Sequence, residues 1–143
     1  TSFEEDETSS ILLGEAKKED IPKYGIAKVK KNSKLHGQEF IEKIVEKPSI
    51  KKAPSNLYAT GRYIFNNDFF KYLSKVSPDK SQEIQLTNAI DFYIKDNKEI
   101  RGFLLDGKIF DCGDNAGYIL ANLEFAMKDP EIKNKLKNYL KKS

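Results

Sequence analysis

The most informative stretch of the chain is Phe40-Ile41-Glu42-Lys43-Ile44-Val45-Glu46-Lys47-Pro48. Its aromatic and β-branched residues predict a strand over residues 40–47 in preference to a helix, although the alternation of apolar and polar positions is imperfect. Pro48 ends the strand because proline has no N–H to donate to a neighbouring strand. The predicted strand therefore delivers an acid and a base, Glu46 and Lys47, to its exit.

Glu46 and Lys47 have the chemistry of a site for a sugar phosphate. A carboxylate accepts several hydrogen bonds from sugar hydroxyls, and a compact ammonium charge beside it suits a phosphate. Two solvated residues at a strand exit are the plainer interpretation, and the two residues taken alone favour it. The pair is a candidate site that needs support from the rest of the chain.

Five more segments are rich in strand-forming residues. One of them contains Gly61, which indicates a close backbone approach within the strand. The dipeptide Asp106-Gly107 is the strongest hairpin signal in the chain and predicts a turn between the last two strands. These predicted strands cover residues 11–13, 25–30, 57–65, 100–105 and 108–111.

Caps and apolar spacing predict four helices. The first follows a cap at Asn66 or Asn67, and the second starts near Ser81 and carries apolar residues at helical spacing. Strands interleaved with helices predict an α/β or α+β chain with a mixed β-sheet and flanking helices. The two C-terminal helices are expected over residues 115–127 and 130–140.

The composition is that of a globular domain. A chain of 143 residues is expected to form one compact unit. The net charge of +3 is scattered and includes only two arginines, Arg62 and Arg101, which argues against nucleic-acid binding. No apolar run approaches the roughly 18 residues of a membrane-spanning helix, so we expect a cytoplasmic protein without a membrane partner.

The chain opens with Thr1 and an acidic, turn-like stretch over residues 1–9, as expected of a piece cut from a longer protein. Cys112 is the single cysteine, which excludes an internal disulfide and any multi-cysteine metal site. Lone cysteines are usually small core residues, and we expect this one to be buried. The single histidine, His36, is expected to be a surface residue in a turn.

The segment Lys23-Tyr24-Gly25-Ile26 places a glycine at the entry to a strand. A glycine there lets a ligand approach the backbone and exposes an N–H as a donor. A glycine that only relieves a turn is the alternative. The pattern taken alone favours this alternative.

Two carboxylates, Asp111 and Asp114, flank Gly113 between a predicted strand and a predicted helix. Oxygen ligands on such a turn suit Mg²⁺, which takes one or two carboxylates and completes its shell with water and phosphate. Asp114 has a competing role as the cap of the helix. Asp111 has no such role, which makes it the candidate metal ligand.

The order and spacing of these pieces resemble the second half of the bacterial UTP–glucose-1-phosphate uridylyltransferases, within the sugar-nucleotidyltransferase superfamily. Each block that carries the resemblance is short, but five of them occur in register over most of the chain. They are Lys23-Tyr24-Gly25-Ile26; Ile44-Val45-Glu46-Lys47-Pro48; Ala53-Pro54-Ser55-Asn56-Leu57 with Gly61-Arg62-Tyr63; Glu83-Ile84-Gln85-Leu86-Thr87-Asn88-Ala89-Ile90; and Phe110-Asp111-Cys112-Gly113-Asp114 with Gly117-Tyr118.

The resemblance implies the C-terminal part of a Rossmann-like nucleotidyltransferase fold and assigns roles to five residues. Gly25 would offer its backbone to a glucose hydroxyl, and Glu46 would accept hydrogen bonds from the sugar. Lys47 would contact the sugar phosphate and take part in catalysis. Asn56 would line the sugar pocket, and Asp111 would be catalytic by holding Mg²⁺.

The implied reaction forms UDP-glucose and pyrophosphate from UTP and α-D-glucose 1-phosphate. The glycine-rich nucleotide loop and the second metal aspartate of the family do not occur in this sequence, so the chain alone is expected to be inactive. We also expect it to associate with itself, because a sheet without its N-terminal strands would have unpaired edges. Tyr58, Ala59, Asn88 and Cys112 depart from the family pattern, and Tyr58 with Ala59 could reshape the pocket wall.

Two other functions remain open from the sequence. One is a related sugar-1-phosphate nucleotidyltransferase, such as a thymidylyltransferase, because the residues that choose the nucleotide are absent. The other is a non-catalytic module for sugar-phosphate binding or oligomerisation.

Overall fold

The computed structural model describes residues 2–30 and 38–141, so the prediction for His36 falls outside the described residues. The chain divides into two compact units, Thr1–Asp106 and Gly107–Ser143, here called unit 1 and unit 2. The expectation of one compact unit is therefore wrong. The sheet ends at Leu104, and the part of the chain that the structure describes has no later strand that would join the C-terminal helices to the sheet.

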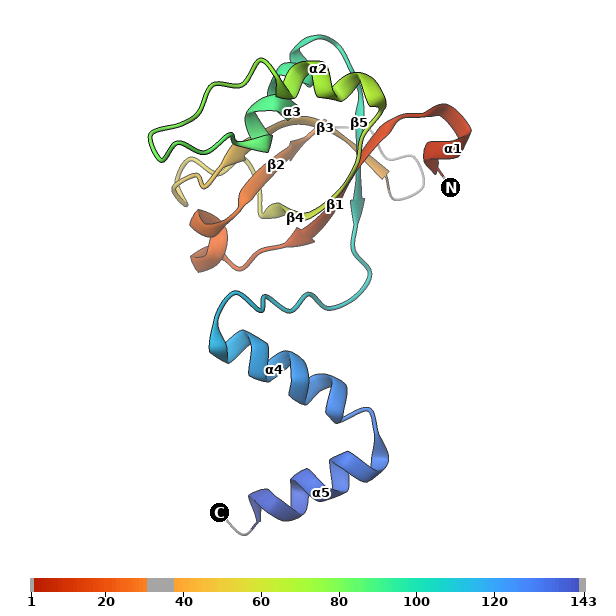
Figure 1. The fold of residues 1–143 in the computed structure, drawn as a ribbon, viewed down its shortest axis with the longest axis vertical. Coiled ribbons are helices and arrows are strands. Elements are labelled where there is room, and N and C mark those ends of the chain that lie inside the picture. The colour runs from red at the N-terminus through yellow and green to blue at the C-terminus, as the bar shows by residue number, and fades with distance from the viewer. Residues whose placement is uncertain (1, 31–37, 142–143) are drawn as a thin grey trace. The chain divides into compact units, whose positions relative to one another are not determined.

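Unit 1 is built on strands that close into a barrel in the order β1-β4-β2-β3-β5 (Figure 1). The pairing of β1 with β5 is parallel and the other pairings are antiparallel, so the predicted mixed sheet is confirmed. Five of the six predicted strands are present, with ends that differ by a few residues. They are β1 (Ser9–Glu15), β2 (Gly25–Val29), β3 (Gln38–Glu46), β4 (Leu57–Ile64) and β5 (Ile100–Leu104).

The hairpin predicted around Asp106-Gly107 does not form, and residues 105–114 contain no strand. Both edges of β5 are already occupied, because it pairs in parallel with β1 and antiparallel with β3. A strand over residues 108–111 would find no free edge of β5 to pair with. Tertiary pairing thus overrides the local turn signal.

Helices α2 and α3 of unit 1 lie together on one side of its strands (Figure 1). Helix α3 packs against β3, and α2 packs against α3 (Figure 1). Asn66 caps the short helix that precedes α2, as predicted, because its side chain accepts a hydrogen bond from the N–H of Asp68 at 3.2 Å. The helical segments are α1 (Ser2–Asp6), η1 (Lys18–Lys23), η2 (Asn67–Phe69), α2 (Phe70–Leu73) and α3 (Leu86–Lys95).

The core of unit 1 lies between the strands and the helical segments η2, α2 and α3. Its residues are less than a tenth exposed, and burying an aliphatic or aromatic side chain of this size contributes about 1.5–3 kcal/mol. The cluster consists of Ile11, Leu13, Ala27, Ile41, Ile44, Phe69, Tyr72, Val76, Ala89, Ile90, Tyr93 and Ile100.

Two predictions of local structure are wrong. Helix α3 begins at Leu86 rather than near Ser81, because the carboxylate of Asp79 accepts hydrogen bonds from the N–H groups of Ser81 at 2.8 Å and Glu83 at 3.1 Å. Such side-chain bonds offer the backbone an alternative to a helix. The opening of the chain is also helical, as α1, where a turn-like stretch was expected.

Unit 2 consists of α4 (Asn115–Ala126) and α5 (Pro130–Leu140), both of which were predicted. Asp114 caps α4 and Asp129 caps α5 through their side-chain oxygens. Many apolar side chains of the two helices are exposed, among them Tyr118, Ile119, Leu120, Phe125, Tyr139 and Leu140. Among the described residues, no helix combines the length and apolar character needed to cross a membrane.

Cys112 is exposed, contrary to the expectation that it belongs to a core. It lies in the irregular segment before α4 and not in the strand that was predicted to end at Asp111.

Candidate functional site

The antiparallel pairing of β2 with β3 brings Gly25 and Glu46 together. The two residues are register partners, Gly25 at the start of β2 and Glu46 at the end of β3. A Cβ atom added to Gly25 would lie 3.2 Å from Oε2 of Glu46, 3.1 Å from Cγ2 of Thr87 and 3.3 Å from Cγ2 of Ile44. We call the space around this position the Gly25 notch. Only glycine leaves it open beside the Glu46 carboxylate.

Lys47 follows Glu46 in an unusual backbone conformation. Its φ is 41°, in the left-handed region that residues other than glycine rarely adopt. Its N–H donates a hydrogen bond to the carbonyl oxygen of Tyr24 at 3.1 Å, which fixes the turn that leaves β3. The exposed side chain of Lys47 thus starts from a residue directly beside the Gly25–Glu46 pair.

The start of β4 lies at the same end of the barrel as the Gly25 notch. Tyr58 is the register partner of Ile26, and its ring stacks on that of Tyr24 with centroids 4.4 Å apart. Asn56, two residues earlier, is exposed, and its carbonyl oxygen accepts a hydrogen bond from the N–H of Ala16 at 2.8 Å. The structure therefore brings Asn56 to the same region. Tyr58, which departs from the family pattern, forms part of the wall of this region.

Thr87 reaches the Gly25 notch from α3. It is the second residue of the helix and is only 6% exposed, and its hydroxyl oxygen is buried without a hydrogen-bond partner among the described residues. Reasoning from the sequence gave this residue no role. A threonine three residues before Ile90, on one face of the predicted helix, was a signal that a hydroxyl would be buried, but its neighbours Gly25 and Glu46 are remote in the sequence.

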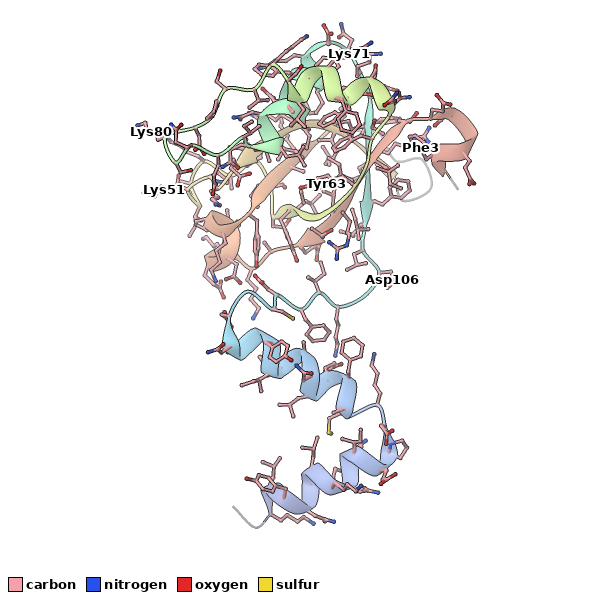
Figure 2. All side chains as sticks on the ribbon, viewed as in Figure 1. Phe3, Lys51, Tyr63, Lys71, Lys80 and Asp106 are labelled. Carbon is pink, nitrogen blue, oxygen red and sulfur yellow. The ribbon has the colours of Figure 1, made fainter. Side chains whose placement is uncertain are left out.

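The Glu46 carboxylate also affects the pKa of Tyr63 on β4. Tyr63 is partly buried and packs against the core of unit 1 (Figure 2). Burial, and then the negative charge of Glu46, raise the pKa of the Tyr63 hydroxyl above its usual value. The phenol is therefore neutral at physiological pH and can donate a hydrogen bond.

An apolar pocket of about 500 Å³, which Tyr63 also lines, lies in unit 1. Phe3, Leu12, Arg62 and Phe103 are among the residues that line it. None of the residues predicted to bind substrate lines this pocket. Its apolar lining does not suit a sugar phosphate, whose hydroxyls and charge need polar partners.

Asp111, the predicted metal ligand, belongs to unit 2. It is exposed, and its Oδ1 accepts a hydrogen bond from the N–H of Gly113 at 2.9 Å. A Cβ atom on Gly117 would lie 1.8 Å from the carbonyl oxygen of Asp111, so only glycine allows the first turn of α4 to fit against this backbone. Glycines thus fix the loop that presents the carboxylate.

Asp111 suits Mg²⁺ as a single carboxylate ligand. Within residues 2–30 and 38–141 there is no group of three His, Cys, Asp or Glu side chains that could hold a metal ion. Mg²⁺ often keeps several waters and takes one or two protein carboxylates together with substrate phosphates. An accessible carboxylate on a fixed loop meets that requirement, whereas a cage made wholly of protein ligands does not form here.

Known proteins similar to this chain point to one family. A family model described as nucleotidyl transferase matches residues 2–128. The UTP–glucose-1-phosphate uridylyltransferase of Haemophilus influenzae is 37% identical over 141 residues, which cover 97% of this chain and 47% of that protein. The protein of the same name from Streptococcus pneumoniae is 35% identical over 140 residues, which cover 96% of this chain and 46% of that protein. The chain therefore spans about half the length of the curated relatives it matches.

Solved structures agree with these relatives. A UDP-glucose pyrophosphorylase complexed with UDP-glucose matches with a TM-score of 0.80 and 35% identity, over 90% of this chain and 47% of that one. A UTP-bound enzyme of the same kind from Acinetobacter baumannii matches with a TM-score of 0.79 and 27% identity, over 97% of this chain and 47% of that one. The fold of the described residues is that of about half of these proteins.

The left-handed backbone at Lys47 predicts an unusual order of stability between two variants. Lys47→Gly should be more stable than Lys47→Ala by about 1 kcal/mol, because the left-handed conformation costs a side chain roughly 1–2 kcal/mol and glycine gives back part of this as chain entropy. Urea unfolding measures the difference. The matched pair Lys43→Gly and Lys43→Ala, inside β3, should show the opposite order. Equal stability of the two Lys47 variants would contradict the strain.

Proposed function

The chain belongs to the nucleotidyl transferase family, and we propose that it supplies the sugar-phosphate side of a uridylyltransferase that makes UDP-glucose from UTP and α-D-glucose 1-phosphate. The observation that carries this proposal is the Gly25–Glu46 register pair with Lys47 beside it. A sugar that carries a phosphate needs an acceptor for its hydroxyls, space against the backbone and a positive charge for its phosphate. A carboxylate, an open backbone position and a lysine at one end of the barrel meet these needs.

Each residue at this end has a distinct role in the proposal. Glu46 is half-buried, so hydrogen bonds from sugar hydroxyls to its carboxylate are less exposed to competing water. Gly25 leaves space for the sugar against the backbone. Lys47 places a flexible positive charge next to the carboxylate, where it binds the phosphate. Asn56 lines the same end as a further polar side chain.

The reaction requires no covalent intermediate on the protein. A phosphate oxygen of glucose 1-phosphate attacks the α-phosphorus of UTP in line, and the bond from that phosphorus to the oxygen bridging to the β-phosphorus breaks. Pyrophosphate leaves with the electron pair. Catalysis of this kind is positioning together with charge neutralisation, which explains why the candidate residues are a lysine and carboxylates.

Asp111 is the proposed ligand for Mg²⁺. The ion supplies positive charge to the phosphates when it is bound. Support comes from the accessible Asp111 carboxylate and from the glycines at 113 and 117 that shape its loop. The contribution of Asp111 itself is a negative charge held at a fixed position on the loop before α4.

UTP is the nucleotide in this proposal. Two of the similar proteins are named for UDP-glucose or were solved with UTP bound, and this chain covers about half of each. The branch of the family therefore supports UTP as the nucleotide in the proposal. A location in the cytoplasm is also part of it and agrees with the absence of a membrane-spanning helix among the described residues.

A homo-oligomer is the last part of the proposal, and its support differs from what the sequence suggested. The strands of unit 1 close on each other, so unpaired sheet edges are not its basis. Instead, α4 and α5 leave apolar side chains exposed within unit 2. Exposed apolar surface of this kind marks an interaction site.

The first functional prediction concerns Glu46. In the full-length enzyme, Glu46→Gln should weaken glucose 1-phosphate binding by about 1.5–3 kcal/mol, the usual worth of hydrogen bonds to a charged group. UTP affinity should barely change, and titration calorimetry with each substrate measures both. Glu42→Gln on the same strand is the control, because Glu42 is exposed and pairs with Lys28. Equal losses for both substrates would point to a damaged fold instead.

The second functional prediction concerns Asp111. Asp111→Asn in the full-length enzyme removes a negative charge where a cation is needed, and the rate of pyrophosphate release should fall at least roughly a hundredfold. The melting temperature should change little because the side chain is exposed. Asp106→Asn, at another exposed aspartate, should keep the normal rate. Near-normal turnover by Asp111→Asn would remove this residue from the active site.

A further inference from the structure

Strands β2 and β4 form the shortest pairing of the barrel. Among the described residues they share a single register pair, Ile26 opposite Tyr58. By contrast, β2 pairs with β3 over its whole length, from Gly25 to Val29. The backbone ladder therefore does little to join β2 to β4, and contacts made by side chains become important between these two strands.

Ser55 supplies one such contact near the start of β4. Its hydroxyl donates a hydrogen bond to the carbonyl oxygen of Ala27 at 2.7 Å and accepts one from the N–H of Leu57 at 2.9 Å. These bonds tie the start of β4 to the middle of β2. Tyr24, the residue before β2, lies beyond this link.

Tyr24 reaches β4 through an aromatic stack. Its ring lies on the ring of Tyr58, with the centroids 4.4 Å apart and the planes inclined by 25°. A stacked pair of aromatic side chains stabilises a fold beyond the burial of its surface. The N–H of Tyr24 also donates to the carbonyl oxygen of Ile21 at 3.3 Å, but that bond stays within the segment before β2. The Tyr24–Tyr58 stack therefore holds the entry to β2 against β4.

The Tyr24–Tyr58 stack lies on the face of β2 opposite the Gly25 notch. Successive side chains of an extended chain point to opposite faces, and Tyr24 is extended, with φ -126° and ψ 159°. Ala27 belongs to the core of unit 1, and Gly25 faces the same way as Ala27. Tyr24 and Ile26 consequently face away from the core. Tyr58 therefore affects the notch through the backbone and not by touching a ligand in it.

The backbone of Tyr24 is linked to two residues of the site. Gly25 follows Tyr24 directly in the chain, and the Tyr24 carbonyl oxygen accepts the hydrogen bond from the N–H of Lys47 at 3.1 Å. Lys47 has a strained left-handed backbone, which persists only where neighbouring contacts hold it. On the other side of the stack, Asn56 lies two residues before Tyr58. The stack thus sets the spacing of Gly25 and Lys47 from Asn56.

We infer that Tyr58 is a positioning residue, which acts through Tyr24 to fix the spacing of the groups that bind the sugar phosphate. These groups are Gly25 and Lys47 on one side and Asn56 on the other. The inference rests on the proposed function, because it takes a sugar phosphate as the ligand. Small displacements of binding groups weaken recognition strongly, so a stack outside the site can determine how well the site distinguishes similar sugars.

Hydrogen exchange without ligand tests the positioning directly. Tyr58→Ala removes the ring, and Tyr58→Phe keeps it. In Tyr58→Ala the N–H of Lys47 should exchange at least about fivefold faster relative to the N–H of Lys30, and in Tyr58→Phe this ratio should stay within about twofold of wild type. Lys30 is a matched reference, because its N–H donates to the carbonyl oxygen of Phe40 at 2.8 Å at the other end of the same two strands. A general loss of stability would speed the exchange of both amides alike.

Binding of two sugar phosphates tests the consequence for the site. Titration calorimetry of the 143-residue chain with glucose 1-phosphate and with its C4 epimer, galactose 1-phosphate, gives a ratio of affinities for each variant. The ratio in favour of glucose 1-phosphate should fall at least about fivefold in Tyr58→Ala and stay within about twofold in Tyr58→Phe. Loss of a purely structural contact would leave the ratio unchanged, since both ligands bind the same folded chain.

Tyr72→Phe provides the matched control for stability. The hydroxyl of Tyr72 on α2 donates a hydrogen bond to Oδ2 of Asp96 at 2.6 Å, so its removal should lower the midpoint of urea unfolding. This variant leaves the Tyr24–Tyr58 stack intact. Both the exchange ratio of the two amides and the affinity ratio of the two sugar phosphates should therefore remain those of the wild type.

The outcomes distinguish the two proposals. If the wild-type chain binds glucose 1-phosphate and Tyr58→Ala leaves either ratio within about twofold of wild type, the inference about Tyr58 is wrong and the proposed function stands. A change in Tyr58→Phe as large as that in Tyr58→Ala also overturns the inference, because Tyr58→Phe keeps the ring. If the wild-type chain does not bind glucose 1-phosphate, the proposed function fails and the inference fails with it.

Discussion

The register between β2 and β3 is the constraint on which the rest of the site depends. It places Gly25 opposite Glu46, so the one residue without a side chain faces the one carboxylate at the end of the strand. A shift by one residue would turn every side chain of the strand to the other face of the sheet. The buried positions Ala27, Ile41 and Ile44 hold the register, because all three belong to the core cluster of unit 1 and such a shift would move them out of it.

The other parts of the site follow from this pairing. The turn after Glu46 closes with a hydrogen bond between Lys47 and Tyr24, at the cost of a left-handed backbone. The packing of α3 against β3 brings Thr87 to the same end of the barrel. A strained residue and an unsatisfied hydroxyl are both unfavourable for folding, and both occur within one small region. Costs of this kind are typical of functional sites, where the surrounding core holds them in place.

The sequence predicted the parts of this site that are local. Gly25, Glu46 and Lys47 became candidates because each stands at the end of a segment with strand-forming residues, but the resemblance and not the local pattern assigned their roles. The caps at Asp114 and Asp129 were recognisable from the local sequence alone. The errors came from long-range effects. The hairpin after Leu104 failed because β5 has both edges occupied, and the prediction of a single unit failed with it. Thr87 was missed because its relation to Gly25 exists only in the folded chain.

The most direct test of the account is to map where glucose 1-phosphate binds on the 143-residue chain itself. Titration of the isotope-labelled chain, followed by the chemical shifts of its backbone amides, gives this map. The account predicts that the largest changes occur at Gly25, Lys47 and Thr87, and that the apolar pocket beside Phe3 and Phe103 is unaffected. Changes concentrated at that pocket, or no changes at millimolar sugar phosphate, would contradict the claim that this end of the barrel binds the sugar phosphate.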